Sequence, residues 1–95
     1  PIGGIVEGLE QSATLLLERH WPLTDSDKVI VIGGISGIQF AGTAYPGDTI
    51  YYYSSLYYLS ENNAIISGCA MVNERIIMVI DKIFVVMGKS KLTDE

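Results

Sequence analysis

The sequence predicts an α+β fold, in which one apolar helix is followed by about four strands of an antiparallel sheet. Two observations lead to this class. Apolar residues recur at helical spacing near the N-terminus, and after residue 28 the pattern changes to β-branched and aromatic segments separated by turn signals. The chain has 95 residues, so we expect a single domain spanning 1–95.

The predicted helix runs from Ile5 to about Arg19. Pro1–Gly4 is a turn-prone entry, and His20–Pro22 ends the helix because the residue before a proline disfavours helical dihedral angles. The helix is apolar over more than half of its circumference, so we expect a sheet to curl around it. The apolar residues at helical spacing are Ile5, Val6, Leu9, Ala13, Leu16 and Leu17.

The first predicted strand, Lys28–Phe40, is rich in β-branched residues. Gly33 and Gly34 within it indicate a bulge, or a place where another group approaches the backbone closely. A strong turn signal follows at Tyr45–Asp48.

Three more strands complete the predicted sheet. The second carries five of the six tyrosines, which places aromatic rings on both of its faces. A short hairpin at 73–74 joins the third strand to the fourth, and 88–95 is expected to be a polar tail. The predicted strands are Thr49–Ser60, Ala64–Val72 and Ile76–Met87.

The chain is more apolar than a small monomer needs for its own core. Hydrophobic residues make up 48% of it, and the mean hydropathy is +0.31. The longest apolar stretches, Ile76–Ile80 and Ile83–Met87, fall far short of the roughly 20 residues that span a bilayer. We therefore expect burial against a partner chain, in a homodimer or a higher oligomer, and no membrane span.

Charge and cysteine content exclude several classes of function. Eleven acidic against six basic residues give a net charge of −5 without any basic cluster, which argues against nucleic-acid binding. The single cysteine, Cys69, fits a reducing compartment such as the cytoplasm and is interpreted as a core residue. With one Cys and one His, a zinc site built on these ligands is excluded, and no cofactor is expected.

Glu7 and Gln11 are the candidate functional pair. They lie four residues apart and so share one helix face, with Thr14 continuing the stripe. Glu7 is either an acid that favours the helix macrodipole or a carboxyl in an apolar groove, placed for proton transfer. Glu10 and Glu18 are interpreted as solvated surface acids. His20 lies about 20 Å from Glu7 along the helix and is interpreted as structural.

Two segments resemble the hot-dog β-hydroxyacyl-acyl carrier protein dehydratases. The stretch from Pro1 to Gln11 is similar to the proline-led start of the family's central helix, and the stretch from Ile32 to Asp48 is similar to its strand and turn ending in Pro-Gly-Asp. The hairpin at Val72–Arg75 also falls where the family has one. The resemblance covers nearly the whole chain, and it implies a bent antiparallel sheet wrapped around one helix, with active sites at the interface of two subunits.

The resemblance also implies an activity, the loss of water from a 3-hydroxyacyl thioester on acyl carrier protein to give the trans-2-enoyl thioester. Glu7 would be the catalytic acid/base carboxyl, and Gln11 would position it or a water. An apolar tunnel near Ile32–Phe40 and the tyrosine strand would hold the acyl chain. The residues implied for substrate binding are Ile2, Gly3, Gly33, Gly34, Ile35 and Phe40.

The chain departs from the family at two points. The family's catalytic histidine precedes the helix, in a region that would precede Pro1, so we expect an N-terminally incomplete domain. Ile2 stands where the family has glycine. Two alternatives remain: a non-catalytic hot-dog subunit that binds acyl chains or completes the site of a histidine-bearing partner in a heterodimer, and a hot-dog thioesterase.

Overall fold

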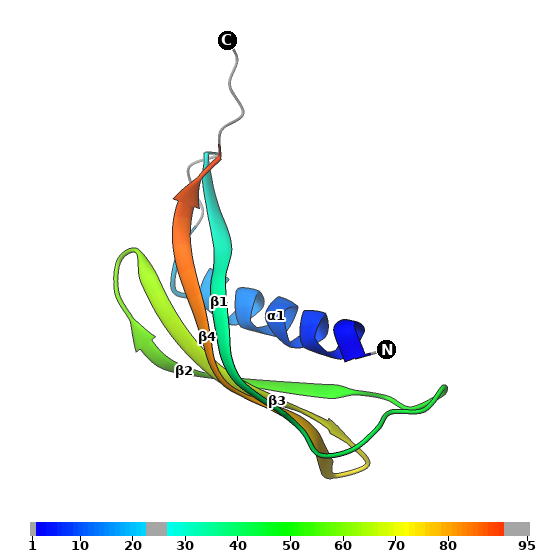
Figure 1. Cartoon of the computed structure of the whole chain (residues 1–95). Helices are drawn as coiled ribbons and strands as arrows, with labels where there is room; N and C mark the ends of the chain where they lie inside the picture. Colours follow the sequence, from blue (N-terminus) through cyan, green and yellow to red (C-terminus); the bar gives the residue numbers. More distant parts are fainter. Residues whose placement is uncertain (1, 23–26, 91–95) are drawn as a thin grey trace.

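The computed structural model describes residues 2–22 and 27–90, and for Ile2 and Gly3 it describes the backbone alone. The helix α1 (Ile2–Glu18) precedes four strands that form one antiparallel sheet in the order β1-β4-β3-β2. Figure 1 shows the sheet strongly bent, with α1 along its concave side. The predicted α+β class is confirmed, and the arrangement is compatible with a hot-dog-like fold. The strands are β1 (Lys28–Phe40), β2 (Tyr51–Leu59), β3 (Asn63–Val72) and β4 (Arg75–Lys89).

The predicted boundaries differ from the structure at the start of the helix and, by one or two residues, at several strand ends, and two of the differences change the fold description. The helix begins at Ile2, so Gly3 and Gly4 are helical and do not form a turn. Their N–H groups belong to the first turn, in which the N–H groups of any α-helix have no acceptor within the helix. Glycine also adopts helical dihedral angles without steric cost. The last strand continues to Lys89 because it pairs with the start of β1, where Lys28 lies opposite Lys89. Residues 91–95 of the predicted tail lie outside the described residues.

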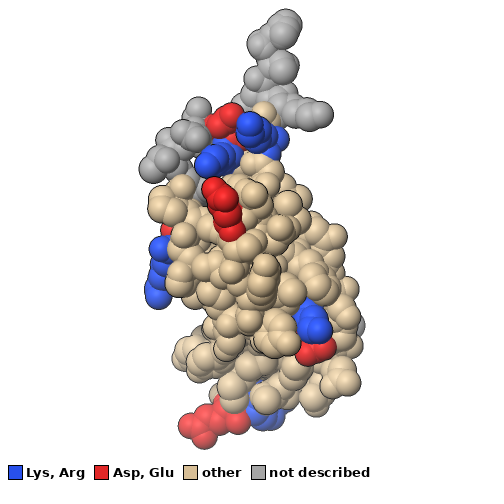
Figure 2. Space-filling view, turned by 90° about the vertical axis from the view of Figure 1, so that its left-hand side faces the viewer, with Lys and Arg blue, Asp and Glu red and all other residues tan. Residues whose placement is uncertain are grey.

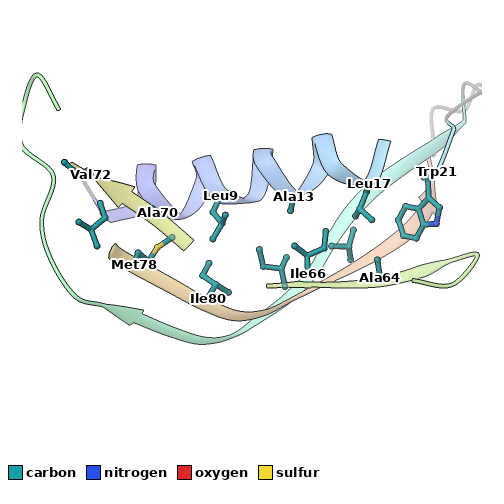
Figure 3. Close-up of a cluster of buried hydrophobic side chains, with 13 residues drawn as sticks. Leu9, Ala13, Leu17, Trp21, Ala64, Ile66, Ala70, Val72, Met78 and Ile80 are labelled. Atoms are coloured by element: carbon teal, nitrogen blue, oxygen red, sulfur yellow. The ribbon is translucent and has the colours of Figure 1, made fainter. Parts of the chain in front are cut away.

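The core lies between one side of α1 and the concave face of β3 and β4. The side chains of Leu9, Ala13 and Leu17 are fully buried (Figure 3). They follow one another at intervals of four residues, so they lie on the same face of α1. Trp21 closes one end of the core, and its indole N–H donates to the Ser60 carbonyl at 3.0 Å. The sheet contributes the buried residues Ala64, Ile66, Ala70, Val72, Ile77, Met78, Ile80, Ile83 and Val85.

Contacts with β2 and β3 hold α1 over one half of the sheet. The Ser12 and Ser54 hydroxyls are hydrogen-bonded at 2.9 Å between helix and β2. A side chain at Gly68 of β3 would place its Cβ 2.8 Å from a Leu9 methyl and 2.6 Å from the Tyr53 carbonyl oxygen. The missing side chain at Gly68 therefore lets the helix pack closely onto β3.

The two edge strands differ in character. In β1 the register shifts at Gly33, which confirms the predicted bulge, and Gly37 has a φ of 75°. In β2 all nine residues are uncharged and none is glycine or proline. Four of its tyrosines, Tyr51, Tyr53, Tyr57 and Tyr58, are exposed, whereas Tyr52 faces the helix. On the face in Figure 2 charged side chains are few and scattered, and uncharged ones cover most of it.

The hairpin at 73–74 carries strain that a single substitution should relieve. Asn73 and Glu74 have φ values of 49° and 67°, the left-handed pair of a type I′ turn, in which Asn-Gly is the preferred sequence. We expect Glu74→Gly to raise the free energy of unfolding by about 0.5–1 kcal/mol, because glycine adopts this conformation without steric cost. Urea denaturation measures the change, and a lower stability of the variant would contradict the turn assignment.

Candidate functional site

A surface hollow of about 510 Å³ lies beside the exposed face of α1. Four polar residues of the helix and one leucine line it on one side, and Ile32 of β1 lines it on the other. Glu7 and Gln11 both lie here, so the fold places the predicted pair in one hollow, together with an apolar side chain from the sheet. The complete lining is Glu7, Glu10, Gln11, Thr14, Leu15 and Ile32.

The helix itself positions these side chains. Because Leu9, Ala13 and Leu17 point into the core, the side of α1 towards β1 carries Glu7, Glu10 and Thr14. Residues at i and i+4 on a helix have Cβ atoms roughly 5–6 Å apart, so the Glu7 carboxyl and the Gln11 amide can approach one another or share a ligand. Both side chains are exposed to solvent.

Glu10 is the residue that the sequence interpretation missed. The sequence predicts a solvated surface acid at this position, but Glu10 is half-buried and lines the same hollow as Glu7. The hydroxyl of Thr14 donates to the Glu10 carbonyl at 3.0 Å, one helical turn away. Positions 7, 10, 11 and 14 follow the i, i+3, i+4, i+7 spacing of one helix face, so this signal was present in the sequence.

The residues implied for substrate binding lie elsewhere on the fold. Gly33 is exposed in the β1 bulge, Gly34 and Ile35 are half-buried, and Phe40 is exposed at the end of the strand. None of the four lines the hollow that holds Glu7, whereas their neighbour Ile32 does. The backbones of Ile2 and Gly3 lie in the first turn of α1.

The only histidine of the chain lies at the other end of the helix. His20 is exposed and lines a separate hollow of about 430 Å³ with Trp21 and Ser60. At 1.5 Å per residue it is about 20 Å from Glu7, so the two side chains cannot act on one atom within a subunit. Cys69 is half-buried in β3 and is not part of the buried core, contrary to its interpretation from sequence.

Residues 2–22 and 27–90 contain neither a metal-binding cluster nor a membrane-spanning helix. No group of three or more His, Cys, Asp or Glu side chains in these ranges could hold a metal ion. Within the same ranges, no helix has the combination of length and apolar character that crossing a membrane requires.

Comparison with known proteins adds no family assignment. No protein-family model matches the chain, and no curated protein matches it significantly by sequence. The resemblance to dehydratases therefore stays a prediction.

Proposed function

We propose that this chain takes part in the dehydration of a 3-hydroxyacyl thioester, carried on acyl carrier protein, to the trans-2-enoyl thioester. Glu7 is the acid/base carboxyl in this proposal, and Gln11 orients it or a water. One observation carries the assignment: a carboxyl and an amide, one helical turn apart, share a hollow with the apolar side chains Leu15 and Ile32.

The reaction needs two proton transfers at one site. A base takes the proton from C2 of the acyl group, the C2–C3 double bond forms, and the C3 hydroxyl leaves as water after protonation by an acid. The carboxyl of Glu7 serves one of these transfers. The second group is an imidazole in the family that the sequence resembles, and His20 is too distant to supply it. The proposal therefore assigns that imidazole to a partner subunit.

The proposal also includes pairing of the chain with a second copy, or with a related chain, along the edge of β2. This edge is the one farther from β1, which lines the hollow of Glu7, so the pairing is separate from the supply of the imidazole. The outer edge of β2 has no strand beside it, and β2 contains no charged residue, glycine or proline, so this edge is prone to pair with another strand. The other edge strand, β1, is interrupted by its bulge and by Gly37. Antiparallel pairing of β2 with its copy would join two sheets and bury the backbone groups of both edges.

Ser55 tests this pairing because it is the central residue of β2. Ser55→Lys places like charges near each other in a symmetric antiparallel pair, so we expect the dimer dissociation constant to rise about fivefold, which corresponds to ~1 kcal/mol. Sedimentation velocity over a concentration series measures it. Gln39→Lys, on the exposed part of β1 and opposite the uncharged Val79 of β4, is the matched control. Equal effects of the two variants, or a monomeric parent protein, would contradict pairing through β2.

One observation favours the alternative of a non-catalytic subunit: within the described residues, no imidazole lies near Glu7. In that case the chain binds an acyl group, or donates Glu7 to the site of a histidine-bearing partner. The thioesterase alternative needs the carboxyl to activate water against the thioester, and nothing in the hollow favours it over dehydration.

Product analysis distinguishes these functions. The protein is incubated with a 3-hydroxyacyl-acyl carrier protein, and both the enoyl product and the free thiol are quantified. The proposal predicts enoyl product. Free thiol without enoyl product would favour the thioesterase, and tight binding without turnover would favour the non-catalytic subunit. Turnover that appears only after addition of a histidine-bearing homologue would favour the heterodimer.

A further inference from the structure

A hollow of about 390 Å³ lies on the convex side of the sheet, beside the hairpin at 73–74. Tyr52 faces the helix on the concave side, so its neighbours in β2, Tyr51 and Tyr53, point to the opposite side because strand side chains alternate. The register places Met71 of β3 opposite Tyr51. The complete lining is Tyr51, Tyr53, Met71, Asn73 and Glu74.

Aromatic rings form one wall of this hollow. Tyr51 and Tyr53 are 57% and 55% exposed, and side chains two residues apart on a strand stand side by side on one face, so one small ligand can contact both. A cation within about 6 Å of an aromatic ring is attracted by the electrons of its face. The same strand already provides such a contact, because the Lys82 ammonium lies 5.7 Å from the centre of the Tyr57 ring.

Glu74 supplies the only charge of the lining. Within residues 2–22 and 27–90, no cationic side chain forms an ion pair with its carboxylate, and the neighbouring Arg75 donates to the Thr43 carbonyl at 3.3 Å instead. Glu74 also has a φ of 67° at a turn position where glycine would be less strained, so the turn alone does not explain a glutamate there. The hollow therefore combines an unpaired negative charge with two exposed rings.

We propose that this hollow binds a small organic cation with a quaternary ammonium head, which lies against Tyr51 and Tyr53 with its charge towards the Glu74 carboxylate. A metal ion or a primary ammonium is strongly hydrated and needs several hydrogen-bond or coordinating oxygens, which rings and the thioether of Met71 do not supply. A methylated nitrogen has no N–H group to satisfy. The net charge of −5 adds a general attraction for cations.

This site is independent of the proposed dehydration. It lies on the other face of the sheet from α1 and shares no residue with the hollow of Glu7. The binding test therefore uses no acyl substrate, and its failure would leave the proposed function as it stands.

Choline is the probe, titrated into the parent protein and followed by NMR of the methionine methyl groups and the tyrosine rings. Its matched control is 3,3-dimethylbutan-1-ol, a neutral alcohol of the same shape with carbon in place of the charged nitrogen. We expect choline to shift the signals of Met71, Tyr51 and Tyr53 and to leave that of Met78, which is 0% exposed in the core, unchanged. The neutral alcohol should bind at least about tenfold more weakly.

Variants of the lining test which groups hold the cation. Tyr51→Leu and Tyr53→Leu should each weaken choline binding about two- to fivefold, the usual contribution of one exposed cation–ring contact. Glu74→Gln should weaken it and make the remaining binding less sensitive to salt. Glu74→Gly should also weaken it although we expect that variant to be more stable, which separates loss of binding from loss of folding. Tyr58→Leu is the control, because Tyr58 is exposed on the same strand but does not line the hollow.

Four outcomes would overturn the proposal. These are absence of choline binding to the parent protein, equal binding of the neutral alcohol, and equal losses in Tyr51→Leu and Tyr58→Leu. The fourth is self-association of the parent protein that Tyr51→Leu abolishes, since a second copy would then cover the hollow.

Discussion

Replacement of Leu9 by alanine is expected to lower the free energy of unfolding by about 2–5 kcal/mol. Leu9 is 0% exposed, and its methyl groups lie over Gly68, where the absent side chain leaves space for them. Truncation would therefore leave a cavity that Gly68 has no side chain to fill. A domain of this size has a total stability of roughly 5–15 kcal/mol, so this single change removes a large part of it.

Urea denaturation followed by circular dichroism measures this effect. Leu15→Ala is the matched control because Leu15 lies on the same helix and is 65% exposed. We expect the control to change stability by no more than about 0.5 kcal/mol. Equal losses in the two variants would contradict the orientation of α1 on the sheet.

Glu7→Gln is expected to lower the rate of dehydration by about 10²–10⁴-fold, the usual contribution of one general acid or base. The amide keeps the size and shape of the side chain but can neither accept nor release a proton at the reacting group. Because Glu7 is exposed and lies outside the core, the variant should retain the fold. Steady-state formation of enoyl thioester measures the rate.

Two other carboxylates of α1 sharpen this test. Glu18 is exposed and does not line the hollow, so Glu18→Gln should leave the rate unchanged. Glu10 lines the hollow and is more buried than Glu7, so Glu10→Gln asks which carboxyl carries the proton. An unchanged rate in Glu7→Gln beside a large loss in Glu10→Gln would transfer the role to Glu10, and unchanged rates in both would remove the hollow from the mechanism.

The order and type of the elements could be predicted from local patterns. The apolar spacing of α1 and the β-branched run of β1 each follow from a periodicity that packing on one face requires. Turn chemistry predicted the hairpin at 73–74, and the paired glycines predicted the bulge at Gly33, because both depend on a few neighbouring residues. These features needed no knowledge of distant contacts.

What could not be predicted depends on the tertiary arrangement. The resemblance implied a binding region near Ile32–Phe40, with Gly33 and Phe40 among its residues, yet of this stretch Ile32 alone lines the hollow, since the bulge and the position of α1 decide which side chain faces the helix. The same holds for the contact of Tyr52 with Gly8, which joins residues 44 positions apart. The helical start at Ile2 was missed because two glycines and a proline favour a turn in local statistics.

The most direct test of the account is to locate a bound 3-hydroxyacyl thioester on the folded protein. Amide NMR spectra are recorded while the thioester is titrated, before any assay of turnover. The account predicts that the largest shifts cluster between Glu7 and Leu15 of α1 and at Ile32 of β1, around the hollow that these residues line. Shifts confined to the hollow around His20, or no shifts at all, would contradict the assignment of Glu7 and Gln11 to the site.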